Sequence, residues 1–187
     1  MQSALLAELF AGSYSLTLYG LPFGVVIKYF FSAFSQNSLR SFIVPSRSAV
    51  EHHAAASDGA IVATGSGMSA MFASIACMVT AGDHIVASAA MFSSCHVVLT
   101  EILPKWGVTV DLVRGNDPAK WAAALSKPTK VVFIESPSNP LMEIVDIRMV
   151  SDLAHKAGAT VIVDNVMASP VLQKPLQLGA DVVMYSA

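Results

Sequence analysis

Six short apolar runs alternate with stretches of helical pattern over the last two thirds of the chain. The runs are apolar along their whole length rather than at every second position, which is typical of parallel strands covered on both faces. Strands are predicted at Ala60–Thr64, His84–Ser88, Val108–Val113, Lys130–Glu135, Thr160–Asp164 and Asp181–Tyr185. Helices are predicted at Met68–Thr80, Phe92–Leu103, Pro118–Leu125 and Asp146–Ala157. This alternation predicts an α/β domain from residue 60 onward, with a mostly parallel sheet and helices on both faces.

The first 59 residues are different, because they show no clean period. We expect this atypical segment to be loop or poorly ordered. Its stretch Ser15–Phe34 is the only candidate for a membrane span in the chain. Gly20, Pro22 and Gly24 interrupt that stretch. Lys28 adds a charge inside it, and we therefore predict no membrane span.

Composition narrows the classes of function. Hydrophobic residues make up 54% of the 187 residues and charged residues only 13%, against about 25% charged in a typical soluble domain. We expect a partner subunit or a larger fold to cover such an apolar chain. The 11 basic and 13 acidic residues leave no positive excess for nucleic acid. Cys77 and Cys95 lack metal-type spacing, which predicts no metal site, no disulfide framework and a reducing cytoplasmic location.

Polar and small residues gather where the predicted strands end. TGSGMSA follows the first strand, MFSSC the second and ESPSNP the fourth, while VDN closes the fifth and YSA the sixth. Loops and helix N-termini converge at the carboxyl edge of an open parallel sheet, and such sheets bind their ligands there. Five such clusters on one edge predict a binding site.

The glycine turn ATGSGMSA joins a strand to the start of a helix. This geometry forms an anion cradle, because the first backbone N–H groups of a helix have no partner within the helix. We predict that the N–H groups of Gly67, Met68 and Ser69 point at a phosphate. The alternative that the turn is merely flexible stays open.

A dinucleotide site is a second alternative for the same turn. Gly65, Gly67 and Ala70 satisfy the Gly-x-Gly-x-x-Ala fingerprint, and Asp83 stands near the distance expected for a ribose-binding carboxylate. That carboxylate has to stand at the carboxyl end of the second strand, whereas Asp83 precedes its strand. The position of Asp83 counts against an NAD-binding Rossmann domain.

Three further residues on this edge have a structural and a functional interpretation, and a fourth, Ser186, has a functional one. Asp164 is a helix cap or loop anchor, or it stabilises a cationic ring nitrogen. Phe92 is a core residue, or its ring stacks on a planar cofactor. Asn139 is a turn residue, or its amide donates to a phenolate oxygen. Ser186 offers a hydroxyl to a phosphate.

The motifs together resemble a known family. ATGSGMSA, ESPSNPLMEIVDI, VIVDN and LGADVVMYSA are similar to motifs of the cystathionine γ-synthase family, the fold type I enzymes of cysteine and methionine metabolism that use pyridoxal 5'-phosphate (PLP). The resemblance covers residues 60–187 and implies the large, cofactor-binding domain. It implies that the phosphate binds Gly67, Met68 and Ser186, that Phe92 stacks on the pyridine ring, that Asn139 contacts the phenolic oxygen and that Asp164 pairs with the ring nitrogen.

Within that family, the stretch MFSSCHVVLTEILPKWGVTVDLV is most similar to the sulfhydrylase branch. This similarity implies a small amino-acid substrate, an O-succinyl or O-acetyl ester of homoserine, which reacts with sulfide to give homocysteine in methionine biosynthesis. Members of the family are tetramers built from dimers. The sister activities, namely cystathionine γ-synthase or lyase and methionine γ-lyase, share every motif quoted and stay open, as does a noncatalytic remnant.

The resemblance also sets expectations about the ends of the chain. In the family, the stretch that matches Tyr185–Ala187 continues with a threonine and then the lysine that forms the Schiff base. We therefore expect no catalytic residue within the 187 residues, no C-terminal domain and no turnover by this chain. The family's Tyr-x-Arg and Asn-Pro-Thr motifs are also not found before the cradle. Our hypothesis is that residues 1–59 come from another reading frame or a misassigned start.

Overall fold

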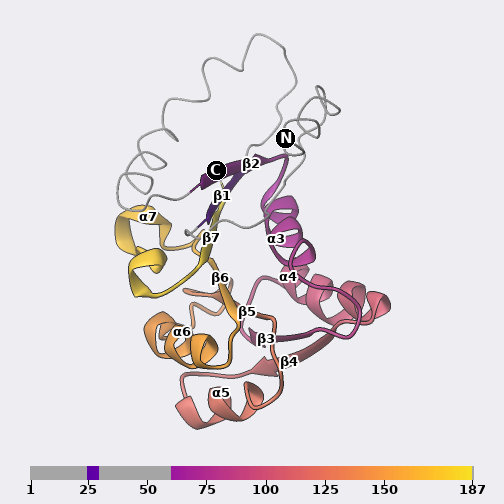
Figure 1. Ribbon diagram of the computed structural model, residues 1–187. Helices are drawn as coiled ribbons and strands as arrows, with labels where there is room; N and C mark the ends of the chain where they lie inside the picture. Colours follow the sequence, from indigo (N-terminus) through magenta and orange to yellow (C-terminus); the bar gives the residue numbers. More distant parts are fainter. Residues whose placement is uncertain (1–24, 30–59, 187) are drawn as a thin grey trace, which may run out of the picture.

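The computed structural model describes residues 25–29 and 60–186, whose seven strands form one sheet (Figure 1). Their order is β2-β1-β7-β6-β5-β3-β4, and every neighbouring pair is parallel. The strands are β1 (Val25–Tyr29), β2 (Ala60–Thr64), β3 (His84–Ser88), β4 (Thr109–Val113), β5 (Val131–Glu135), β6 (Thr160–Asp164) and β7 (Val182–Tyr185). The six strands predicted from the apolar runs are confirmed to within one residue at each end.

Strand β1 was not predicted. It lies between β2 and β7 and pairs with both of them, although it belongs to the segment that shows no clean period. Its sequence, VVIKY, is a short run rich in β-branched residues. The other predictions made for residues 1–24 and 30–59, including most of the membrane-span candidate Ser15–Phe34, lie outside the described residues. Among the helices that the structure describes, none is both long and apolar enough to cross a membrane.

The helices lie on both faces of the sheet, with α3 and α4 on one side and α5 and α6 on the other (Figure 1). The four predicted helices are confirmed, and their bounds are α3 (Gly67–Ala76), α4 (Ser93–Val97), α5 (Pro118–Ala124) and α6 (Ile147–Lys156). After α4 the chain continues as a π turn (Val98–Ile102) and a 3-10 turn (Leu103–Trp106). Two short elements were not predicted, the helix α7 (Ser169–Leu172) and the 3-10 turn Pro175–Leu178.

Alternation along the strands divides the core into two layers. Phe133 of β5 packs with Met71 and Leu99 on the α3/α4 side. The next residue, Ile134, packs with Trp121 on the α5/α6 side. Because successive side chains of a strand point to opposite faces, the residue after Ile134 faces the α3/α4 side again. The last residues of β5 and β6 are both acidic, and both have this orientation.

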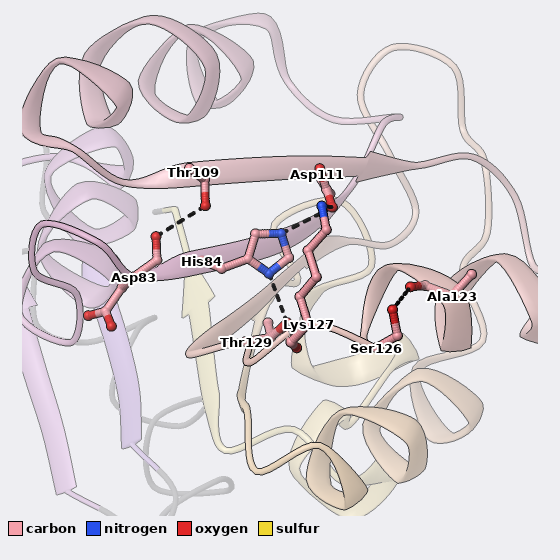
Figure 2. A network of polar contacts seen from close by, with 8 residues as sticks. All are labelled: Asp83, His84, Thr109, Asp111, Ala123, Ser126, Lys127 and Thr129. Carbon is pink, nitrogen blue, oxygen red and sulfur yellow. Dashed lines mark hydrogen bonds and ion pairs between the residues drawn. The ribbon is translucent and has the colours of Figure 1, made fainter.

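A polar network closes the opposite, amino edge of the sheet (Figure 2). His84 begins β3, and its Nδ1 lies 2.9 Å from Oγ1 of Thr129. The Thr129 hydroxyl donates to the Lys127 carbonyl at 3.0 Å, so Nδ1 of His84 is the donor in the first contact. Nε2 of His84 lies 3.2 Å from Oδ2 of Asp111 without hydrogen-bond geometry. The Lys127 ammonium donates to the same Oδ2 at 2.6 Å, so Asp111 links β3, β4 and the turn before β5.

We expect Asp111→Asn to lower the free energy of unfolding by about 1 kcal/mol at neutral pH. The hydrogen bond from Lys127 lowers the pKa of the Asp111 carboxyl below its ordinary value. A carboxyl with a lowered pKa stabilises the folded state above its unfolded pKa of about 4 and loses that effect as the pH falls through the folded value. Urea unfolding of the parent and the variant at pH 7 and pH 3 measures this difference, which should shrink at the lower pH.

The matched control is Asp152→Asn, because Asp152 is exposed on α6 and has no side-chain partner among the described residues. Equal losses in the two variants would contradict a specific role of Asp111.

Candidate functional site

The turn that is predicted to be an anion cradle lies between β2 and α3. Ser66 is the N-cap of α3 with an extended backbone, and its Oγ accepts from the Ser69 N–H at 3.1 Å. The N–H groups of Gly67 and Met68 have no partner among the described residues. The prediction that Ser69 also presents its amide was wrong, because the cap already uses that donor. Two free N–H groups at the positive end of a ten-residue helix suit one phosphate.

Asp164 ends β6 with 5% of its surface exposed. Its Oδ1 accepts from the Val166 N–H at 3.0 Å, and its other oxygen has no partner in the part of the chain that the structure describes. One oxygen therefore anchors the following loop, and the other is available to a ligand. Burial, with a smaller contribution from the negative charge of Glu135, raises the pKa of the Asp164 carboxyl to about 7.

Phe92 is the N-cap residue of α4, and 39% of its surface is exposed. The ring is therefore not a core residue, and part of its surface is open to solvent. Its backbone N–H donates to Oε2 of Glu135. This bond ties the start of α4 to the end of β5.

Asn139 lies half-buried in the loop after β5. Its N–H donates to Oε1 of Glu135 at 2.9 Å, and its side-chain amide has no partner among the described residues. Two fully buried serines hold this loop: Ser136 Oγ accepts from the Val145 N–H at 3.0 Å, and Ser138 Oγ accepts from the Glu143 N–H at 3.1 Å. The Asn139 amide is thus free to bind a ligand while its backbone is fixed.

Ser186 follows β7 directly and is exposed, and its hydroxyl has no partner within the described ranges. Strand β7 is the neighbour of β6, so Ser186 lies at the same edge as Asp164. No contact of its own ties it to the other predicted residues.

Cys95 marks the point where the elements of the site meet. It is buried on α4, and its thiol lies 3.9 Å from the sulfur of Met68 on α3. Burial, followed by the charges of Asp164 and Glu135, raises the pKa of the Cys95 thiol to about 12. The starts of α3 and α4 therefore share one neighbourhood with the ends of β5 and β6.

Two residues of the site were missed by the sequence analysis. Glu135 is 2% exposed, is the register partner of Asp164 and binds the backbones of Phe92 and Asn139. Asn165 is fully buried and donates to carbonyls of the α7 region, including that of Gln173 at 3.0 Å. A signal for Glu135 was present, because an acidic residue ends the apolar run VVFIE just as Asp164 ends TVIVD.

The dinucleotide alternative lacks its carboxylate. Asp83 lies before β3 at the amino edge (Figure 2), where its Oδ2 accepts from the N–H of Thr80 at 2.7 Å and from the Thr80 hydroxyl at 3.1 Å. This position is at the opposite edge of the sheet from the turn between β2 and α3. Asp83 is therefore a turn residue.

The structure is that of an α/β protein whose sheet edge carries free N–H groups at a helix N-terminus and a buried carboxylate at a strand end. A family profile described as "Cys/Met metabolism PLP-dependent enzyme" matches residues 32–187. The chain belongs to this family of enzymes, and the resemblance of its motifs is confirmed. The match takes in residues 32–59, and the proposed boundary near residue 59 stays a prediction.

Relatives and a solved structure agree with this assignment. O-succinylhomoserine sulfhydrylase of Mycobacterium tuberculosis is 53% identical over 127 residues, which are 68% of this chain and 31% of the relative. That of Pseudomonas aeruginosa is 41% identical over 159 residues, 84% of this chain and 38% of the relative. The crystal structure of apo CalE6, a methionine gamma lyase from Micromonospora echinospora, is 39% identical with a TM-score of 0.60 and covers 64% of this chain and 32% of that one.

The chain thus spans about a third of the length of these relatives. The predicted fold class, the α/β large domain of fold type I PLP enzymes, is confirmed for the part that the chain contains.

We expect Asp164→Asn to stabilise the cofactor-free chain above pH 7. A carboxyl whose folded pKa of about 7 exceeds its unfolded value of about 4 loses stabilising free energy as the pH rises through this range. Removing the charge should therefore raise the free energy of unfolding on the order of 3 kcal/mol at pH 8 and much less at pH 4. Urea unfolding at both pH values tests this, and Glu101→Gln, at an exposed carboxylate, serves as the control. A variant less stable than the parent at pH 8 would refute it.

Proposed function

We propose that this chain forms the cofactor-binding part of a PLP-dependent sulfhydrylase. The enzyme converts O-succinylhomoserine, or its O-acetyl analogue, and sulfide into homocysteine in methionine biosynthesis. The observation that carries the cofactor assignment is Asp164. It is a buried carboxylate with a raised pKa, and one of its oxygens has no partner among the described residues. The charged form of such a group is stabilised when a cation binds it, and a protonated pyridine nitrogen is that cation.

The residues present fit PLP at each of its polar ends. The free N–H groups of Gly67 and Met68 receive the phosphate, and the exposed hydroxyl of Ser186 adds a donor. The half-exposed ring of Phe92 packs on the pyridine face. The unpartnered amide of Asn139 donates to the phenolic oxygen.

Asp164 holds a proton on the ring nitrogen, because a carboxylate next to a nitrogen favours the protonated form. When bound, the cofactor supplies an electron sink that acidifies the carbon-bound protons of the amino-acid substrate and lets the γ-acyl group leave. The buried surroundings of Asp164 strengthen its interaction with the cation, since water competes little there.

Two sulfhydrylases among the relatives support the choice of substrate. The likeness to a methionine γ-lyase structure keeps a sister activity as the alternative. Because we expect no turnover by this chain alone, the test uses the longer enzyme of which it would be the cofactor-binding part. Homocysteine formation from each acyl homoserine with sulfide, compared with thiol release from methionine and from cystathionine, separates these activities. Turnover of methionine in preference to both esters would decide for the lyase.

We also propose that the protein works as a homo-oligomer in the cytoplasm. Apolar side chains stand open beside the site, with Val171 84% and Leu172 81% exposed on α7 and Leu141 64% exposed in the loop after β5. A second subunit would remove this apolar surface from water. Both cysteines are free thiols, which suits a reducing compartment.

We expect PLP to raise the melting temperature of the chain, and Asp164→Ala to abolish this rise. Ligand at 100 times its Kd stabilises the folded state by about 2.7 kcal/mol, and removal of the carboxylate removes the partner of the ring nitrogen. Differential scanning fluorimetry with increasing PLP measures the shift. Asp152→Ala, at an exposed aspartate far along α6, should respond like the parent. The absence of any shift in the parent would overturn the cofactor assignment.

We expect Phe92→Leu to weaken PLP binding about 2- to 10-fold, because an aromatic contact contributes about 0.5–1.5 kcal/mol beyond area burial. Absorbance titration gives the affinity. Trp106→Leu is the matched control, since Trp106 is an exposed aromatic residue that packs edge-on against Phe72 rather than near the site. Equal affinities of the Phe92 variant and the parent would exclude stacking.

A further inference from the structure

Glu135 uses both of its carboxylate oxygens to join two loops of the site. Oε2 accepts from the N–H of Phe92, at the start of α4, and Oε1 accepts from the N–H of Asn139 at 2.9 Å. Glu135 is only 2% exposed. The two residues that it binds are those whose side chains would face the ring and the phenolic oxygen of one planar ligand.

Neither N–H is supplied with another acceptor by local structure. Phe92 is the N-cap of α4 and has no side-chain cap bond, so its amide belongs to the set that a helix leaves unpaired. The amide of Asn139 lies in a loop whose other backbone bonds run to Ser136 and Ser138. Glu135 is therefore the common anchor of both residues.

The negative charge of Glu135 has a cost that a purely structural acceptor would avoid. Burial raises the pKa of the Glu135 carboxyl, and the same charge contributes to the raised pKa of Asp164, its partner across β5 and β6. A second buried charge beside Asp164 costs free energy, even though both of its oxygens accept hydrogen bonds. The free-energy cost of placing two carboxylates close together falls where a cation binds next to them.

We propose that Glu135 is a positioning residue of the cofactor site, which fixes the separation between Phe92 and Asn139 so that one planar ring fits between them. It acts through these two backbones and does not touch the ligand. Its charge also strengthens the negative potential that Asp164 offers to a ring cation. The proposal rests on the proposed function, and the test separates the two.

The first test compares two probes, PLP and inorganic phosphate, on the parent chain and on Glu135→Gln. Phosphate alone reports the cradle at α3, whereas PLP also reports the ring pocket. Glutamine keeps one acceptor oxygen but places an NH₂ group against the second N–H. We expect Glu135→Gln to weaken PLP at least tenfold and to leave phosphate affinity within twofold, as measured by absorbance and ³¹P NMR titration.

Glu143→Gln is the matched control, since Glu143 is exposed in the same loop and only its backbone forms hydrogen bonds: its N–H donates to Ser138 Oγ, and its carbonyl accepts from the Ser138 N–H. Unchanged PLP affinity in Glu135→Gln overturns the proposal. Parallel loss of both probes overturns it as well, because that is the result of general unfolding.

A second variant, Glu135→Asp, separates the effect of side-chain length from the effect of charge. Aspartate keeps the charge but is one methylene shorter, so it cannot serve both loops. We expect PLP affinity to fall as in Glu135→Gln, while the Asp164 carboxyl, followed by ¹³C NMR, still titrates near its parent pH. In Glu135→Gln that titration should move to lower pH, and so should the titration of the Cys95 thiol on α4, because the charge of Glu135 contributes to both raised pKa values. An unmoved Asp164 titration in Glu135→Gln contradicts the electrostatic part.

Amide hydrogen exchange tests the positioning without any ligand. The amides of Phe92 and Asn139 should be protected in the parent and in Glu143→Gln, and should exchange quickly in Glu135→Gln. Retained protection in Glu135→Gln overturns the positioning role. A parent that binds no PLP overturns the proposed function, and the exchange rates still decide the role of Glu135.

Discussion

The carboxylate of Asp164 at the end of a buried strand is the interaction on which the site depends. Water reaches little of it, one of its oxygens is satisfied by the Val166 amide, and the other has no partner among the described residues. An isolated buried anion is among the most expensive groups that a fold can hold. The cofactor-free structure therefore carries a local instability, which a cationic ring nitrogen would relieve under the proposed function. Ligand binding and stability would then be coupled through this one group.

The direction of Asp164 follows from the sheet. Side chains alternate along β5 and β6, and the residues that precede the two acidic ends by two positions, Phe133 and Ile162, lie in the layer under α3 and α4. Both carboxylates consequently point to the face of the sheet that α3 and α4 cover. A shift of either strand by one residue would turn its carboxylate toward α5 and α6. The apolar core thus sets the geometry of the polar site.

Most of the fold could be predicted, because uninterrupted runs of valine and isoleucine have few alternatives to a buried strand. Strand β1 was missed although Gly20, Pro22 and Gly24 precede it, because the surrounding segment shows no clean period and was interpreted as loop. The short helix α7 and the turn Pro175–Leu178 were missed because elements of four residues carry no period. The predicted helix from Phe92 continues through π and 3-10 turns, with Pro104 in the last of them.

A residue of the candidate site could be predicted where its type and its position at the sheet edge indicate a role. It could not be predicted where hydrogen bonds to the backbone determine that role. Asp164 and the cradle follow from position on the sheet edge. The role of Glu135 was not predicted, because one of its two partners, the backbone N–H of Phe92, is distant in the sequence and neither partner is a side chain. Ser69 was assigned an open amide because the competing hydroxyl of Ser66 shows only in the capped helix.

The network of His84, Asp111 and Lys127 lies at the rim opposite the ligand site. The two rims share strands but no side chains. An evolving lineage can accordingly adjust its heat tolerance at the amino rim while its chemistry at the carboxyl rim is left alone. Substitutions that accumulate among homologues at the first rim would then record growth temperature, and those at the second would record substrate.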